Sequence, residues 1–158
     1  MRVLQRKQRI ATTIENAWEF FSNPRNLSRI TPPDMKFEII PPLPENIFAG
    51  LIIRYRITPL MGIPLVWVTE ITHCEPPYRF VDEQRFGPYR FWHHQHRFHK
   101  QGNETVMEDV VHFALRFEPF MFFVNSLIDK KVNEIFDFRE KTVSQIFAKA
   151  LSVEETVK

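Results

Sequence analysis

Residues 89–100 have the sequence YRFWHHQHRFHK, in which Trp92, His94, His96 and Phe98 occupy every second position. Successive side chains of a β-strand point to opposite faces of a sheet, so these four side chains share one face. Trp92 and Phe98 are large and apolar, which makes theirs the inward face. The stretch therefore predicts a strand that turns two imidazoles toward an aromatic interior.

The same alternation continues on both sides of this stretch, from Met35 to Phe117, with no helical pattern in between. In one run, for example, Ile53, Tyr55 and Ile57 alternate with arginines. Turn-forming segments separate the runs: Pro41-Pro42-Leu43-Pro44, Pro59, Glu75-Pro76-Pro77, Gly87-Pro88 and Gln101-Gly102-Asn103. We expect six consecutive strands here, and because antiparallel neighbours need only short connections, a meander is the economical topology.

Before this region, the pattern predicts one strand and two short helices. The strand covers Val3–Ile10, and Thr12 with Glu15 has the spacing of a capping box for the first helix. Asn23-Pro24 indicates the start of the second helix, which Pro32-Pro33 stops.

After the strands, Asn125-Ser126 offers a cap for a long C-terminal helix. Apolar residues then recur at helical spacing through about 25 residues. One long helix must cover the apolar face of a seven-stranded antiparallel sheet, and the two short helices close one end. The predicted fold class is therefore α+β.

Composition and charge describe one globular domain over residues 1–158 with an enlarged aromatic interior, since 16 Phe stand against 4 Gly. The net charge is only +2, and the sequence shows no concentrated basic face of the kind that nucleic-acid binding needs. We therefore expect no nucleic-acid partner. The single Cys74 has no internal disulfide partner. No apolar stretch approaches the roughly 20 residues of a membrane span. We expect a cytoplasmic protein without a transmembrane segment, and the oligomeric state stays open.

The element order and three motifs resemble those of a known superfamily. The motifs are Asn23-Pro24-Arg25-Asn26-Leu27 with Ile30-Thr31-Pro32-Pro33, Gly87-Pro88-Tyr89 leading into Trp92-x-His94-x-His96-x-Phe98, and Ile135-Phe136-Asp137-Phe138-Arg139. Together they are similar to the SRPBCC superfamily of START-related and birch-pollen-allergen-like domains, and in particular to its small bacterial stand-alone proteins.

The resemblance implies a helix-grip fold, in which a curved seven-stranded sheet wraps around the long C-terminal helix. It also implies a cavity that in relatives binds lipids, sterols, polyketides or other apolar molecules. For this chain we expect no built-in cofactor. The chain departs from its relatives at Phe117–Val124, which replaces a Gly-bearing loop before the last helix. The apolar run Phe120–Val124 is expected to pack as a buried loop, or to serve as a hydrophobic gate or a docking surface.

Alternation places five polar side chains on the inward face of an otherwise aromatic interior. These are Asp82, Gln84, His94, His96 and Asp109. Burial without partners would cost each of them several kcal/mol, so they must pair with one another, with water or with a ligand. The full set of expected ligand contacts is Tyr55, Trp67, Phe80, Asp82, Gln84, Phe86, Trp92, His94, His96, Phe98, Asp109, Val111, Phe113 and Phe136.

Several interpretations of the polar residues stay open. The His and Asp side chains satisfy each other as a purely structural pair, or they form the polar end of a pocket for a small hydrophobic molecule. Alternatively, His94 or His96 acts as a general acid or base that Asp109 orients, as the resemblance to polyketide cyclases suggests. Two-residue His spacing is a weak metal signal, so we predict no metal site. Small-ligand binding is the leading hypothesis, ahead of a cyclase, dehydratase or isomerase and of a protein-interaction module.

Overall fold

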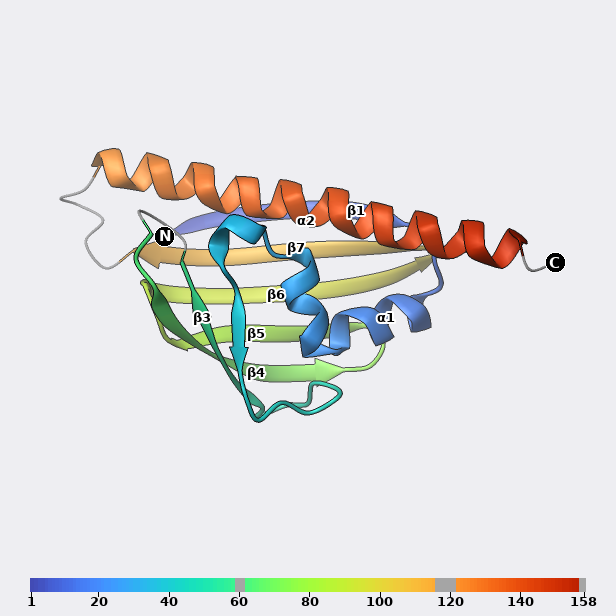
Figure 1. Cartoon of the computed structure of the whole chain (residues 1–158), viewed down its shortest axis with the longest axis horizontal. Helices are drawn as coiled ribbons and strands as arrows, with labels where there is room; N and C mark the ends of the chain where they lie inside the picture. Colours follow the sequence, from blue (N-terminus) through green and yellow to red (C-terminus); the bar gives the residue numbers. More distant parts are fainter. Residues whose placement is uncertain (59–61, 116–121, 157–158) are drawn as a thin grey trace.

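The structure is a computed structural model that describes residues 1–58, 62–115 and 122–156, and their side chains except at 122–125 and 150–156. Within these residues, seven strands form one antiparallel sheet in the order β1-β7-β6-β5-β4-β3-β2 (Figure 1). Their bounds are β1 Arg2–Ile10, β2 Glu38–Ile40, β3 Ile52–Ile57, β4 Leu65–Glu75, β5 Arg79–Phe86, β6 Tyr89–Gln101 and β7 Glu104–Leu115. The predicted meander and the α+β class are confirmed.

The short helices follow β1, as predicted, with one correction at each. Helix α1 spans Ile14–Ser22, and its N-cap is Thr13, whose Oγ1 accepts a hydrogen bond from the backbone N–H of Asn16 at 3.3 Å. The capping box predicted from Thr12 is therefore wrong by one residue. The second helix is a 3₁₀ segment, η1 (Pro24–Ile30), which ends before Pro32-Pro33 as predicted, and a further 3₁₀ segment that was not predicted, η2 (Pro33–Met35), follows it. The Asn23 side chain accepts from the backbone N–H of Arg25, which confirms the predicted cap.

The C-terminal helix α2 is longer than predicted. It spans Phe122–Thr156, so Asn125-Ser126 lies inside it and is not its cap. Asn and Ser cost only about half a kcal/mol more than Ala inside a helix, so they do not force it to begin there. Residues 116–121 and the side chains of 122–124 lie outside the described part, so the expected roles of Phe120–Val124 stay predictions.

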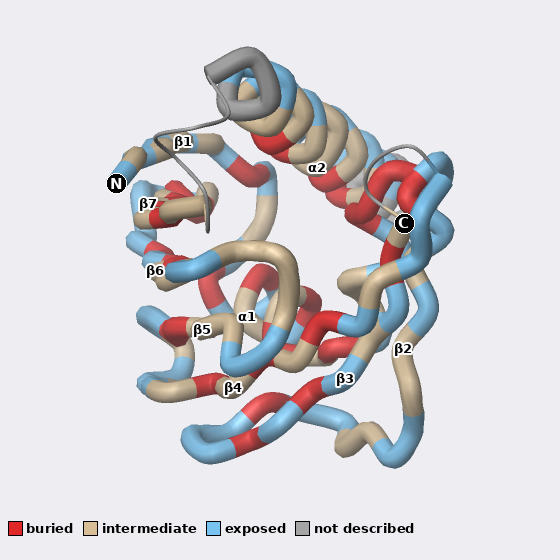
Figure 2. The backbone as a smooth tube through the Cα atoms, turned by 90° about the vertical axis from the view of Figure 1, so that its left-hand side faces the viewer, coloured by how far each residue is buried: buried red, intermediate tan, exposed pale blue. Residues whose placement is uncertain are grey.

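The sheet curls into an open barrel that α2 closes. In Figure 2, the strands curve from β1 through β4 to β2, and α2 lies across the opening between the two edge strands. Among the side chains that the structure describes, the enclosed ones form three apolar clusters, one against α1 around Phe98, one against α2 around Phe136 and one around Trp67. The helix therefore serves as one wall of the interior, and the concave sheet serves as the other.

The alternation fails at the end of β5. Phe86 was placed on the inward face, but it is 61% exposed. The β4–β5 register shifts here, because Val68 pairs with Phe86 whereas the next residue, Thr69, pairs with Gln84. The extra residue is a β-bulge, which turns the following side chain to the other face. The inward placement of Phe86 is therefore wrong.

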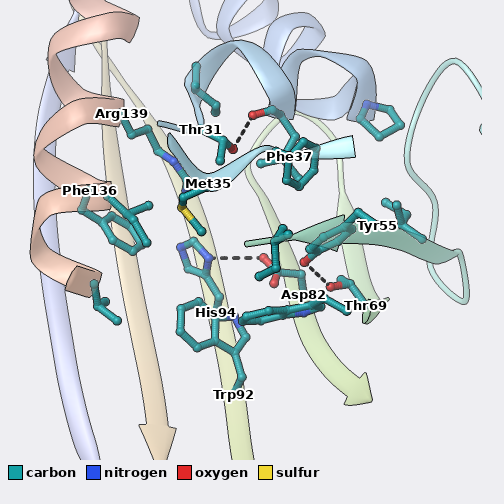
Figure 3. A pocket seen from close by; sticks show the side chains of 18 of the residues that line it. Thr31, Met35, Phe37, Tyr55, Thr69, Asp82, Trp92, His94, Phe136 and Arg139 are labelled. Atoms are coloured by element: carbon teal, nitrogen blue, oxygen red, sulfur yellow. Dashed lines mark hydrogen bonds and ion pairs between the residues drawn. The ribbon is translucent and has the colours of Figure 1, made fainter. Parts of the chain in front are cut away.

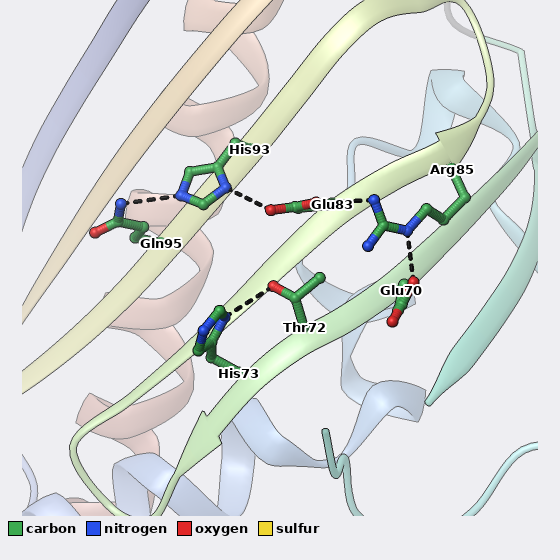
Figure 4. A network of polar contacts seen from close by, with 7 residues as sticks. All are labelled: Glu70, Thr72, His73, Glu83, Arg85, His93 and Gln95. Carbon is green, nitrogen blue, oxygen red and sulfur yellow. Dashed lines mark hydrogen bonds and ion pairs between the residues drawn. The ribbon is translucent and has the colours of Figure 1, made fainter. Parts of the chain in front are cut away.

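The outer face of the sheet is polar, as the opposite parity predicts. Figure 4 shows His93 between Glu83 and Gln95, and Arg85 contacting Glu83 and Glu70. The His93 imidazole lies 2.8 Å from the Glu83 carboxylate and 3.0 Å from the Gln95 amide. This network lies on the far side of the sheet from α2, so the aromatic interior and the surface network are separated by the strands.

Candidate functional site

A cavity of about 380 Å³ lies between the concave sheet, the 3₁₀ segments and α2. Figure 3 shows side chains from each of these elements pointing into it. Its wall is mostly aliphatic and aromatic. Because this cavity remains open, the 16 Phe side chains do not fill the interior. The predicted contacts that line it are Tyr55, Trp67, Phe80, Asp82, Trp92, His94, His96 and Phe136.

The other predicted contacts lie elsewhere. Phe98, Val111 and Phe113 are almost completely buried but pack in the core and do not line the cavity. The side chain of Gln84 instead bonds both backbone groups of Tyr89 across the β5–β6 turn. Alternation predicts which face of the sheet a side chain occupies. It does not predict which of the inward side chains border the cavity and which pack in the core.

Two imidazoles and two carboxylates form one buried cluster beside the cavity. Asp82 comes from β5, His94 and His96 from β6, and Asp109 from β7. His94 Nε2 lies 2.8 Å from Asp109 Oδ1, and His96 Nε2 lies 2.8 Å from Asp82 Oδ2. Asp82, His94 and His96 line the cavity, whereas Asp109 lies behind the imidazoles. Side chains from three neighbouring strands thus meet at one point.

The strand register explains why they meet. Asp82 is directly opposite His94, and Asp109 is directly opposite His96. The closest contacts are nevertheless diagonal, and the directly opposite pairs are at 3.3 Å for His94 Nδ1 to Asp82 and 3.0 Å for His96 Nδ1 to Asp109. Each imidazole therefore contacts both carboxylates, within the reach of cross-strand neighbours.

The surroundings of Asp82, Asp109 and His94 favour the ionised form of each side chain. Burial alone would raise the pKa of Asp82, but the charge of His94 and the hydrogen bonds from both imidazoles hold that pKa well below its usual range. Burial likewise opposes ionisation of Asp109, and hydrogen bonds from His94 and His96 hold its pKa well below normal. Burial would lower the pKa of His94, yet the two carboxylates raise it overall. An imidazolium donating to carboxylates is thus the favoured state of His94.

Aromatic side chains frame the cluster on the sheet side. Phe80 stacks on His96, with ring centroids 3.9 Å apart, and Trp92 packs edge-to-face on Trp67 at 5.3 Å. Tyr55 Oη is 2.8 Å from Thr69 Oγ1, and burial raises the pKa of Tyr55 far above its normal range. Tyr55 is therefore a neutral group with an apolar face and one polar tip.

Sequence reasoning missed Arg139, which reaches into the cavity from α2 (Figure 3). Its guanidinium carbon lies 4.9 Å from the centroid of the Phe136 ring. The two residues are three apart in a helix, so they share one face. That spacing, within the motif already noted at Ile135–Arg139, was the available signal.

A metal ion would find one possible set of ligands among the described residues. Asp82, His94 and His96 each offer one ligand atom, and these atoms lie within 4.8 Å of one another. The same side chains already bond each other as imidazoles and carboxylates, so a cation would have to displace protons from them. The expectation of no metal stays a prediction.

The comparisons with known proteins support the fold. The chain matches the crystal structure of protein Ms6760 from Mycobacterium smegmatis, with 18% identity, a TM-score of 0.70 and coverage of 94% of this chain and 92% of that one. It matches protein TTHA0849 from Thermus thermophilus with 17% identity, a TM-score of 0.67 and coverage of 94% and 99%. A START superfamily protein from Mycobacterium smegmatis matches with 12% identity, a TM-score of 0.66 and coverage of 91% and 98%.

These likenesses confirm the helix-grip fold, and at such identities they show the fold alone. No family model matches the sequence, and no curated protein matches it. In the part of the chain that the structure describes, no helix combines the length and apolar character needed to cross a membrane.

Proposed function

We propose, given the helix-grip fold that the chain shares with a START superfamily protein, that it binds a small, largely apolar molecule in the cavity between sheet and α2. The observation that carries this proposal is the cavity itself, whose volume of about 380 Å³ falls within the range of small-molecule sites. An apolar wall with a few convergent polar groups is the usual composition of such sites. The aromatic lining favours a ring-containing ligand.

Native mass spectrometry of protein purified from its own cells, followed by organic extraction, tests this proposal. We expect a bound small molecule to be retained at stoichiometric amounts. A variant that fills the cavity, Ile135→Phe, should lose it, because Ile135 lines the cavity from α2. The matched variant Leu127→Phe, at a position of the same helix that is 51% exposed, should retain it. Equal retention by both variants would place the molecule elsewhere.

Acid–base catalysis is a second candidate, favoured by one specific contact. His94 lines the cavity while its Nε2 donates to Asp109 at 2.8 Å, so a carboxylate orients a protonated imidazole beside an apolar site. This arrangement suits a general acid in a cyclase, dehydratase or isomerase. The role of Asp109 is to position His94, and His96 is the alternative proton carrier.

Hydrogen–deuterium exchange into an enolisable aromatic ketone, followed by NMR, tests the catalytic candidate without the natural substrate. We expect the protein to accelerate the exchange, with His94 donating a proton to the ketone oxygen while a water molecule removes the α-proton, and we expect His94→Gln to abolish the acceleration. His99→Gln, at an imidazole with a 57% exposed side chain, should leave it unchanged. If His94→Gln keeps the full rate, the catalytic candidate fails while the binding proposal stands.

A further inference from the structure

The charged side chains around the cavity are balanced with one exception. Asp82 is paired with His94 and His96 in the cluster described above. Lys131 also lines the cavity, and its Nζ lies 2.7 Å from Asp34 Oδ2. Across the described residues, Arg139 makes no hydrogen bond and no ion pair, and its Nε is buried without a partner. A permanent positive charge therefore faces an apolar cavity without a counter-ion.

The Arg139 side chain is also held in place. It extends from α2 beside Met35, and its guanidinium packs over the Phe136 ring (Figure 3). Contact with an aromatic face fixes a guanidinium without satisfying its N–H donors. Arg139 is half-buried, and its buried Nε–H is left unsatisfied; such a donor on a charged group is costly to bury alone, and pairing with an anion removes that cost.

We propose that Arg139 binds the carboxylate of a ligand that is otherwise apolar, so that the preferred ligand is an amphipathic monocarboxylic acid. This proposal rests on the proposed binding function and names the ligand class. The planar guanidinium presents paired N–H donors that match the two oxygens of a carboxylate. The carboxylate would lie on the α2 side, and the apolar body would lie against Trp67 and Trp92 on the sheet.

The balance of charge points to a monoanion. Arg139 supplies one positive charge, and the carboxylate of Asp82 on β5 also borders the cavity. Both act on the hydroxyl of Tyr55, since Asp82 raises its pKa and Arg139 lowers it. Because Asp82 is already paired with His94 and His96, Arg139 offers the one unpaired charge among the described residues at the cavity, and a second negative charge on the ligand would be buried without a partner.

Calorimetric titration with dodecanoate and with methyl dodecanoate tests the proposal. The two probes share the same chain, and only the first carries a carboxylate at neutral pH. We expect dodecanoate to bind at least about tenfold more tightly, in line with a hydrogen-bonded charge pair. Arg139→Met, which keeps an apolar stem but removes the charge, should reduce dodecanoate binding to the level of the ester and leave the ester unchanged.

Two further variants control for charge and shape. Arg139→Lys should keep part of the preference for the acid, because it restores the charge without the planar fork. Lys130→Met removes a positive charge from the same helix at a side chain that is 74% exposed, and it should bind like the wild type.

The outcomes separate the two proposals. If acid and ester bind the wild-type protein equally, or if Arg139→Met weakens both equally, the carboxylate proposal is overturned while apolar binding stands. If neither probe binds, and no other apolar compound does, the proposed function itself fails.

Discussion

The Nε2 atom of His94 lies 2.8 Å from Oδ1 of Asp109, although the residue directly opposite His94 on β7 is Val111. The hydrogen bond therefore runs diagonally across the pair of strands. His96 and Asp82 complete the cluster, with His96 Nε2 at 2.8 Å from Asp82 Oδ2. A contact of this kind joins strands at a point that their backbone pairing does not specify.

Asp109→Asn should destabilise the fold, because it removes one of two buried carboxylates and leaves the His94 imidazolium with one. We expect the free energy of unfolding to fall by about 2 to 4 kcal/mol. Glu108→Gln, the neighbouring carboxylate on the outer face, should change it by less than about 1 kcal/mol. Urea unfolding at neutral pH measures both, and equal values would show that the buried cluster adds nothing to stability.

The cluster should give stability a maximum in mildly acidic solution. The pKa values of Asp82 and Asp109 are depressed in the folded state, so their contribution is present above about pH 4 and is lost as pH falls through the folded values. The pKa of His94 is raised, so its contribution is present below about pH 6.5 and is lost as pH rises through the folded value. Urea unfolding from acidic to alkaline pH measures both limbs.

His94→Gln separates the two limbs of that profile. The variant removes the group whose pKa is raised, so the fall in stability on the alkaline side should become shallower. The acid limb should persist but become smaller and end at a higher pH, because the carboxylates lose a cationic partner and their folded pKa values rise toward the unfolded value. An alkaline limb of unchanged slope would mean that another group is responsible for it.

The bulge in β5 predicts that two phenylalanines of one strand contribute very different amounts to the free energy of unfolding. Phe80 is buried and stacks on His96, so Phe80→Ala should cost about 3 to 5 kcal/mol. Phe86 is 61% exposed, so Phe86→Ala should cost less than about 0.5 kcal/mol. Thermal or urea unfolding of the two variants decides between this geometry and unbroken alternation, which would make their effects similar.

The N-cap of α1 predicts a difference between two adjacent threonines. Thr13→Ala removes the acceptor for the Asn16 N–H and should cost about 1 kcal/mol. Thr12→Ala should have a smaller effect, because the cap is the next residue. A larger loss at Thr12 in urea unfolding would restore the capping box predicted from the sequence.

The fold followed from local patterns, because strand alternation, turn residues and helical spacing all act over a few residues. Asn23, for example, caps the segment after it as its side-chain chemistry predicts. The start of α2 did not follow, since Asn125 and Ser126 are tolerated inside a helix as well as at its end. Local preference decides little where two arrangements differ by so small a free energy.

The site was predictable to the extent that it depends on which face a side chain occupies. Asp82, His94 and His96 were placed on the inward face by alternation, and they meet beside the cavity. Phe86 was misplaced, because a bulge depends on the pairing of two strands and leaves no mark on the alternation of one. Arg139 was missed, because its missing partner is evident only once every neighbouring charge has been located.

The edge-to-face contact between Trp67 and Trp92, with rings 5.3 Å apart and planes at 89°, gives the cavity an optical signature. Two indoles this close couple their electronic transitions, so the pair acts as one chromophore in the near-ultraviolet. Trp18 lies in the core against Phe80 and Phe98, away from that pair. Circular dichroism of the coupled indoles therefore reports occupancy of the cavity without a label, for any ligand that shifts one ring against the other.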